Sequence, residues 1–268
     1  MTDGSTDGRT TSCVLVFAGL DPSGGAGIQA DIQAIGAAGA HPLPVVTALT
    51  VQDNQHVHAV HPVDPMILRE QVRVLVEQGT RIDAVKIGIV GSAANAQAIA
   101  QAITLLRERE PGLPVVLDPV LASGHGDLLT KGDAVVALAP LRRLATLVTP
   151  NLPEARALCG TDDIDLQARQ LMNDAPHVLI KGGHGAGDAV VNRWFCGGRS
   201  RSWSWPRLPG EYHGSGCTLA SAIAARLALR QTMEDAIDAA QQYTQRSLEY
   251  AFAIAEGQRI PDRRKEFS

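Results

Sequence analysis

The chain has 268 residues, of which 45% are hydrophobic, and its formal net charge is -4. This length fits one α/β domain or two small ones, and the hydrophobic share is sufficient to bury a sizeable core. Charged residues make up 19% of the chain and form no long basic run. The composition therefore does not favour a nucleic-acid partner.

Neither an export signal nor a membrane span is expected from the sequence. The polar segment 1–11 has no apolar core of the kind found in signal peptides, and no uninterrupted apolar stretch is long enough to cross a bilayer. The cysteines at positions 13, 159, 196 and 217 form no C-x-x-C pair, which is typical of a reducing compartment. We therefore predict a cytoplasmic protein without contact to a membrane.

Short apolar runs rich in β-branched residues alternate with longer segments of helical period, which predicts parallel strands joined by crossover helices. The predicted strands are 13–18, 44–50, 84–90, 114–118, 145–149 and 178–181. The predicted helices are 28–38, 65–78, 93–108, 153–158, 217–230 and 233–255. Two β-rich arms flank Gly197 and Gly198 within 188–205, which predicts an antiparallel hairpin at a mixed edge of the sheet.

The chain is expected to form a single domain. No internal repeat and no low-complexity linker interrupts the alternation of strands and helices. We predict a disordered N-terminal tail at 1–12, one domain at 13–257, and a charged C-terminal tail at 258–268 that frays.

A glycine-rich turn, AGLDPSGGAGIQAD at 18–31, lies between the first predicted strand and helix. Its glycines at 24, 25 and 27 allow a ligand to approach the backbone closely. The turn lacks the G-x-G-x-x-G spacing of dinucleotide sites and the Lys-Ser/Thr ending of a Walker A loop. A nicotinamide-dependent oxidoreductase is therefore disfavoured, while a ligand-binding turn and a purely structural turn both stay open.

A second glycine-rich segment, HGSGCTLASAIAA at 213–225, leads into a long apolar helix. Gly214, Ser215 and Gly216 stand where free N–H groups and the helix dipole favour an anion, such as a phosphoryl group in transfer. Cys217 lies in the first turn, where the same field is expected to lower the pKa of its thiol and suit it to accept a proton. The alternative is that Cys217 is a small packed hydrophobic residue.

Polar residues also follow other predicted strands. Asn151, Glu154 and Asp118 offer oxygen ligands for a hydrated Mg²⁺ ion, although Glu154 could serve only to complement the dipole of its helix. Lys181, followed by two glycines, is either a phosphate contact or a solvated surface charge. All these clusters lie at carboxyl ends of strands or at a helix N-terminus, the edge where open α/β sheets bind ligands.

Taken together, the chain closely resembles the hydroxymethylpyrimidine and phosphomethylpyrimidine kinases of thiamin biosynthesis, in the ribokinase-like superfamily. The resemblance covers 14–255 and keeps the motifs in family order. They are AGLDPSGGAGIQAD, VVTALTVQ, VKIGIV, VLDPV, TPNLPEA, IKGGH and HGSGCTLASAIAA. Cys217 points to this pyrimidine branch, because many ribokinase-like kinases carry aspartate there.

The resemblance implies an α/β three-layer sandwich, with a mostly parallel central sheet and helices on both faces. It also implies ATP as co-substrate, Mg²⁺ and a homodimer. The pyrimidine would contact Gly19, Asp31 and Gln52 between apolar walls at Ile89 and Val120. The remaining implied sites are phosphoryl transfer at Gly214, Ser215, Gly216 and Cys217, ATP contacts at Asn151, Lys181, Gly183 and Thr218, and Mg²⁺ at Asp118 and Glu154.

Two departures from the family pattern leave details of the substrate open. The family often has an Ala-Lys-Ser-Gly-Asp stretch after its Asp-Pro-Val segment, whereas this chain has LASGHGDLL at 121–129, in which His125 is the candidate replacement for the lysine. The wall position often held by methionine is Ile89. A pyridoxal or vitamin B6-type kinase and a non-catalytic pyrimidine-binding relative therefore stay open as alternatives.

Overall fold

The computed structural model describes residues 11–122, 129 and 132–264 of the chain. The strands are β1 (Cys13–Leu20), β2 (His41–Gln52), β3 (Val57–Pro62), β4 (Ala84–Ile87), β5 (Val115–Leu117), β6 (Leu147–Val148), β7 (His177–Ile180), β8 (Ala189–Cys196) and β9 (Arg199–Pro206). The helices are α1 (Gly27–Ala37), α2 (Pro65–Glu77), α3 (Ala93–Arg109), α4 (Ala134–Leu144), α5 (Leu152–Cys159), α6 (Ile164–Leu171), α7 (Ser215–Ala228) and α8 (Met233–Glu249).

The strands form one mixed sheet in the order β3-β2-β1-β4-β5-β6-β7-β8-β9. The six neighbouring strands β2, β1, β4, β5, β6 and β7 are parallel to one another. Strand β3 at one edge, and β8 and β9 at the other, pair antiparallel. The predicted parallel core and the predicted hairpin are thus confirmed. Strand β3 was not predicted, because its sequence VHAVHP mixes histidines with apolar residues and ends in proline.

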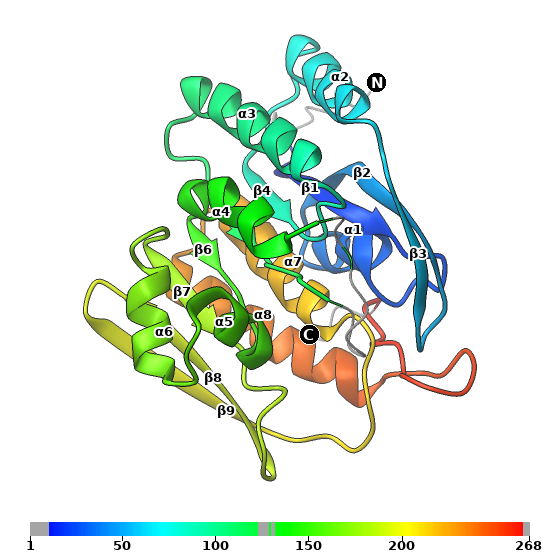
Figure 1. Ribbon diagram of the computed structural model, residues 1–268, viewed down its shortest axis with the longest axis vertical. Helices are drawn as coiled ribbons and strands as arrows, with labels where there is room; N and C mark the ends of the chain where they lie inside the picture. The colour runs from blue at the N-terminus through cyan, green and yellow to red at the C-terminus, as the bar shows by residue number, and fades with distance from the viewer. Residues whose placement is uncertain (1–10, 123–128, 130–131, 265–268) are drawn as a thin grey trace, which may run out of the picture.

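Helices cover both faces of this sheet (Figure 1). Side chains alternate along β1, so that Val14 and Val16 pack toward α1, α7 and α8, whereas Leu15 and Phe17 pack toward α2, α3 and α4. Both pairs are fully buried. The predicted three-layer α/β sandwich is confirmed, with one core on each face of the sheet.

Three helical regions differ from the predicted ones. Helix α4 contains Pro140, a residue that disfavours a helix interior, and α6 is a short helix capped by Asp163, so neither had a clear sequence signal. Helix α8 ends at Glu249 and not at 255. The chain turns there because Phe252 pairs antiparallel with Ile260.

The C-terminal segment does not fray where the structure describes it, so the predicted domain end at 257 is wrong. Ile260, Asp262 and Arg263 are buried, and the Asp262 N–H donates to Ser247 O in α8 at 2.9 Å. Residues 258–264 therefore belong to the packed domain. Residues 1–10 and 265–268 lie outside the described part of the chain.

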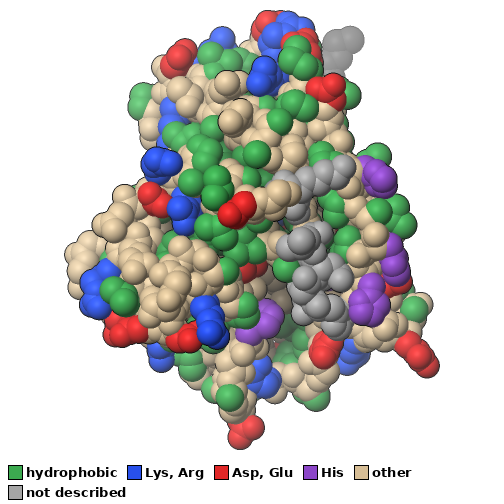
Figure 2. Space-filling model, in the orientation of Figure 1, with side chains coloured by type: hydrophobic (Ala, Val, Ile, Leu, Met, Phe, Trp, Pro, Cys, Tyr) green, Lys and Arg blue, Asp and Glu red, His purple; other side chains and the backbone are tan. Residues whose placement is uncertain are grey.

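The visible surface has no dominant charge. Figure 2 shows Lys and Arg side chains interspersed with Asp and Glu side chains over the face that it presents. Within the ranges that the structure describes, none of the helices combines the length and the apolar character needed to cross a bilayer.

A buried ion pair joins three elements beneath the sheet edge that carries the glycine-rich turns. Lys86 Nζ of β4 lies 2.8 Å from Asp31 Oδ1 and 2.9 Å from Oδ2 on α1, and neither side chain is exposed. Ser221 Oγ of α7 donates to Asp31 Oδ1 at 2.6 Å. Because an unpaired buried charge is costly, each partner depends on the other.

Replacing Lys86 by methionine is expected to destabilise the fold strongly. The Lys86→Met change leaves the Asp31 carboxylate buried without its counter-ion, which costs about 3–5 kcal/mol of the free energy of unfolding. The double variant Lys86→Met/Asp31→Leu removes both charges and is expected to recover most of this loss. Urea unfolding of the wild type, both single variants and the double variant tests this, and equal losses in the single and double variants would contradict it.

Candidate active site

A cavity of about 570 Å³ opens where the predicted clusters meet, at the carboxyl ends of the parallel strands. All but two of the site residues expected from the sequence line it. They are Gly19, Gln52, Ile89, Asp118, Val120, Asn151, Glu154, Lys181, Gly183, Gly214, Ser215, Gly216 and Cys217. Two glycine-rich segments border the cavity, the first glycine turn (21–27) and the second glycine turn (213–217).

The second glycine turn brings the N-terminus of α7 to the cavity wall. The first intrahelical bond runs from Thr218 N–H to Gly214 O, so the amides of Ser215, Gly216 and Cys217 precede the helical ladder. Gly214 has a φ of 79° and provides no side chain to cap them. These N–H groups and the helix dipole make this end of α7 suited to an anion.

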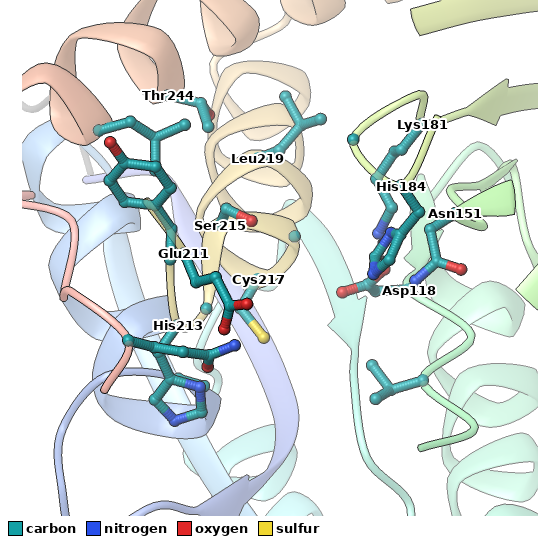
Figure 3. A pocket seen from close by; sticks show the side chains of 18 of the residues that line it. Asp118, Asn151, Lys181, His184, Glu211, His213, Ser215, Cys217, Leu219 and Thr244 are labelled. Atoms are coloured by element: carbon teal, nitrogen blue, oxygen red, sulfur yellow. Dashed lines mark hydrogen bonds and ion pairs between the residues drawn. The ribbon is translucent and has the colours of Figure 1, made fainter. Parts of the chain in front are cut away.

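Cys217 is partly buried at the start of α7, and its thiol faces the cavity (Figure 3). Burial raises the pKa of this thiol, and the positive charge of Lys86 opposes that change without reversing it. The expectation of a lowered thiol pKa is therefore wrong. The thiol is held in its neutral form near pH 7, where it can donate a hydrogen bond but is a poor proton acceptor.

The opposite wall carries a charged pair (Figure 3). Lys181 Nζ, just after β7, lies 2.6 Å from Asp118 Oδ1, just after β5. Burial alone would lower the pKa of Lys181, but Asp118 and Glu154 beside it raise that pKa and keep the side chain charged. A Cβ atom at Gly216 would lie 3.0 Å from Lys181 Nζ, so the ammonium and the start of α7 face each other at close range.

Asn151 and Glu154 form a capping box at the start of α5. Glu154 N–H donates to Asn151 Oδ1, and Asn151 N–H donates to Glu154 Oε2, both at 2.8 Å. The structural role considered for Glu154 is thus present, and the same carboxylate also lines the cavity. Burial raises the pKa of Glu154 to about 7, against the opposing influence of Lys181.

The first glycine turn is held by Asp21. Its carboxylate accepts the N–H groups of Ser23 and Ala26 at 2.8 Å each, and His213 Nε2 of the second glycine turn lies 2.8 Å from Oδ2. Burial would raise the pKa of Asp21, but hydrogen bonds from His213, Gln52 and Ser23 hold it at about 2. Asp21 therefore stays ionised and fixes Gln52 beside the cavity.

The structure corrects two expected ligand contacts, Asp31 and Thr218. Asp31 is fully buried in its pair with Lys86, and Thr218 Oγ1 is bonded to Gly214 O at 2.8 Å and to Arg263 Nε at 2.6 Å. Neither residue lines the cavity. Both support the glycine turns from behind. His125, the candidate replacement for the family lysine, lies outside the described residues.

Sequence reasoning missed several residues that shape the site, among them Asp21 in the first glycine turn. His213 directly precedes Gly214, and Lys86 lies within the VKIGIV motif, so both had a signal in the motifs. Arg263, in contrast, lies in a charged run that resembles a tail. Its hydrogen bond to Gly25 joins residues 238 positions apart, and no local pattern points to such a contact.

The arrangement can hold an anion between two positive features. The N-terminus of α7 lies on one side and the Lys181 ammonium on the other, while Asn151 and Glu154 stand beside Lys181. Gln52, Ile89 and Val120 line the part of the cavity next to Gly19. This geometry suits transfer of a charged group to a small, flat molecule.

The sequence profile of the phosphomethylpyrimidine kinase family matches residues 21–262. A hydroxymethylpyrimidine/phosphomethylpyrimidine kinase of Mycobacterium tuberculosis is 37% identical over 259 residues, which cover 93% of this chain and 93% of that protein. The chain also matches a thiamine biosynthesis multifunctional protein of Corynebacterium efficiens at 37% identity, and the match covers 91% of this chain but only 34% of that protein's length.

Solved structures of two kinds share the fold. A pyridoxal kinase of Staphylococcus aureus in complex with AMP-PCP and pyridoxal has a TM-score of 0.84 at 25% identity, covering 96% of this chain and 94% of that one. A phosphomethylpyrimidine kinase of Clostridium difficile has a TM-score of 0.74 at 31% identity, covering 88% of this chain and 99% of that one. With its ribokinase-like fold, its family match over most of its length and its cavity between the two glycine turns, the chain belongs to the phosphomethylpyrimidine kinase family.

Proposed function

We propose that this protein transfers the γ-phosphoryl group of ATP to the hydroxymethylpyrimidine of thiamin biosynthesis, and then to the resulting monophosphate. The observation that carries the proposal is the opposition of the α7 N-terminus to Lys181 across one cavity. Relatives at 37% identity that bear the name of this activity support it.

Different residues that line the cavity contact the pyrimidine, the phosphates of ATP and the phosphoryl group in transfer. The pyrimidine lies beside Gly19, with its polar edge on Gln52, whose amide both donates and accepts hydrogen bonds, and its faces on Ile89 and Val120. Asn151, Lys181 and Gly183 contact the phosphates of ATP. The Ser215, Gly216 and Cys217 amides then stabilise the charge on the phosphoryl oxygens in the transition state. Phosphoryl transfer through a loose transition state places little demand on a base, which agrees with a neutral Cys217.

Asp118 and Glu154 are the residues that would hold Mg²⁺. Both carboxylates line the cavity near Lys181, and oxygen ligands suit this ion. Among the described residues, no group of three or more His, Cys, Asp or Glu side chains is placed to hold a metal. Two carboxylates would suffice for Mg²⁺, which is commonly bound by one or two carboxylates together with substrate phosphates, and the ion would neutralise the charge of those phosphates.

The purified protein is expected to release ADP from Mg-ATP in the presence of either the hydroxymethylpyrimidine or its monophosphate. Separate incubations with the two pyrimidines and with pyridoxal, followed by mass identification of products, check this. The incubation with pyridoxal is included because the fold is similar to that of pyridoxal kinases. Turnover of pyridoxal alone would overturn the proposed substrate, and pyrimidine binding without ADP release would indicate a non-catalytic binding protein.

Cys217→Ala and Gly216→Val are expected to differ sharply in severity. The Cys217→Ala variant keeps every backbone donor, and its kcat should fall about 10-fold to 10²-fold. In Gly216→Val the phosphoryl group can no longer reach the backbone donors, and kcat should fall about 10²- to 10³-fold or more. The valine side chain would start 3.0 Å from Lys181 Nζ and fill the path of the phosphoryl group. Steady-state kinetics test this, with Gly36→Ala as control because its Cβ meets nothing within 4 Å. Complete inactivation by Cys217→Ala would contradict the assigned roles.

Activity at limiting Mg²⁺ is expected to rise with pH through about 7, since the pKa of Glu154 is raised to about 7 and only its ionised form attracts the ion. Additional Mg²⁺ favours the carboxylate and should move the midpoint to lower pH. Glu154→Gln, measured over the same range, is the matched control. This variant keeps the titration of ATP but lacks the Glu154 carboxyl, so the comparison with the wild type separates the two contributions. A midpoint that is the same in this variant would show that Glu154 is not the titrating group.

A further inference from the structure

Arg263 lies where the two glycine turns meet, behind the cavity wall. Its side chain is fully buried, although the sequence places it in a charged run near the C-terminus. The two turns are packed so closely here that a Cβ atom at Gly214 would lie 2.1 Å from Gly25 O and 2.8 Å from Arg263 Nη2. A side chain at position 214 would therefore collide with both the first glycine turn and this guanidinium.

One guanidinium hydrogen-bonds to both turns. Arg263 Nη2 donates to Gly25 O at 2.5 Å in the first glycine turn and lies 3.4 Å from Gly214 O in the second. Arg263 Nε donates to Thr218 Oγ1 at 2.6 Å in the first helical turn of α7. The planar fork of an arginine can make these bonds at once, which a lysine ammonium on a flexible stem cannot reproduce.

The backbone that carries Arg263 is itself fixed. Tyr243 OH of α8 donates to Arg263 O at 2.9 Å. His213 N–H donates to Arg259 O and Arg259 N–H donates to Glu211 O, both at 2.9 Å. Arg259 thus pairs with the chain that enters the second glycine turn, and the backbone of Arg263 is held by α8.

The acceptors of Arg263 are uncharged carbonyl, hydroxyl and amide oxygens. A buried cation is retained only when its donors are satisfied, and here they are satisfied without a carboxylate among these acceptors. Among the residues that the structure describes, the hydrogen-bond acceptors of its guanidinium carry no charge, and the carboxylates of Asp31 and Asp21 act on it without a direct hydrogen bond. The guanidinium lies behind Gly214, on the side of the turn opposite to the proposed phosphoryl site, where it reinforces the attraction of the α7 N-terminus for an anion.

We propose that Arg263 is a positioning residue for phosphoryl transfer. It holds the first glycine turn, and with it the pyrimidine side of the cavity, at a fixed separation from the donors of α7. The inference rests on the proposed kinase function. Misplacement of these two halves by a small distance would lower the rate of transfer more than the affinity for either substrate.

The kinetic test compares Arg263→Met, Arg263→Lys and Arg264→Met. Arg264 is the matched control, because its side chain is 68% exposed, pairs with Asp262 and lies over the ring of Phe252, away from both glycine turns. We expect Arg263→Met to lower kcat about 10²-fold, comparable to loss of one transition-state donor, and Arg263→Lys to lower it about 10-fold. The Kd values of ADP and of the pyrimidine should change less than about 3-fold, since ground-state binding is largely retained.

Hydrogen exchange provides a readout that does not depend on turnover. Arg263→Met should increase exchange of amides in 24–27 and in 214–217 together, while Arg264→Met leaves both segments as in the wild type. This separates failure of the inference from failure of the proposed function. Unchanged exchange in both turns, or a kcat per folded molecule equal to that of the wild type, would overturn the role of Arg263. A loss of pyrimidine affinity as large as the loss of kcat would also overturn it.

Discussion

The amide groups at the start of α7 are the feature on which the rest of the site depends. A helix N-terminus that enters a cavity needs partners for these donors, and Gly214 cannot supply one because it has no side chain. The turn takes this shape only with glycine at 214, where φ is 79° and a Cβ atom would collide with Gly25 O. The same geometry that prevents capping by the protein leaves the donors to a bound anion.

Several positively charged side chains surround this helix end. Lys181 faces α7 from across the cavity, and its pairing with Asp118 keeps it ionised despite burial. Lys86 is neutralised by its buried ion pair with Asp31. Arg263 hydrogen-bonds to uncharged acceptors such as Gly25 O between the two glycine turns. A negatively charged phosphoryl group would therefore meet a positive environment that is organised before it arrives, which is the arrangement that lowers the barrier to transfer.

The alternation of strands and helices predicted the parallel core, because buried parallel strands are short, apolar and β-branched. Most of the site residues that the motifs predicted do line the cavity, since carboxyl ends of parallel strands meet at one edge. Asp31 and Thr218 could not be placed correctly, because whether a polar side chain faces a ligand or a buried partner depends on tertiary contacts such as the one with Lys86. Arg263 escaped prediction for the same reason, as its charge and position favour an exposed tail.

The most direct test of the account is a crystal structure with ADP, Mg²⁺, aluminium fluoride and the hydroxymethylpyrimidine. The account predicts that the fluoride group, which mimics the transferred phosphoryl group, lies between the amides of 215–217 and Lys181 Nζ, with the pyrimidine hydroxyl in line beyond it. A fluoride group bound elsewhere in the cavity, out of reach of the α7 amides, would contradict the central role assigned to this helix end.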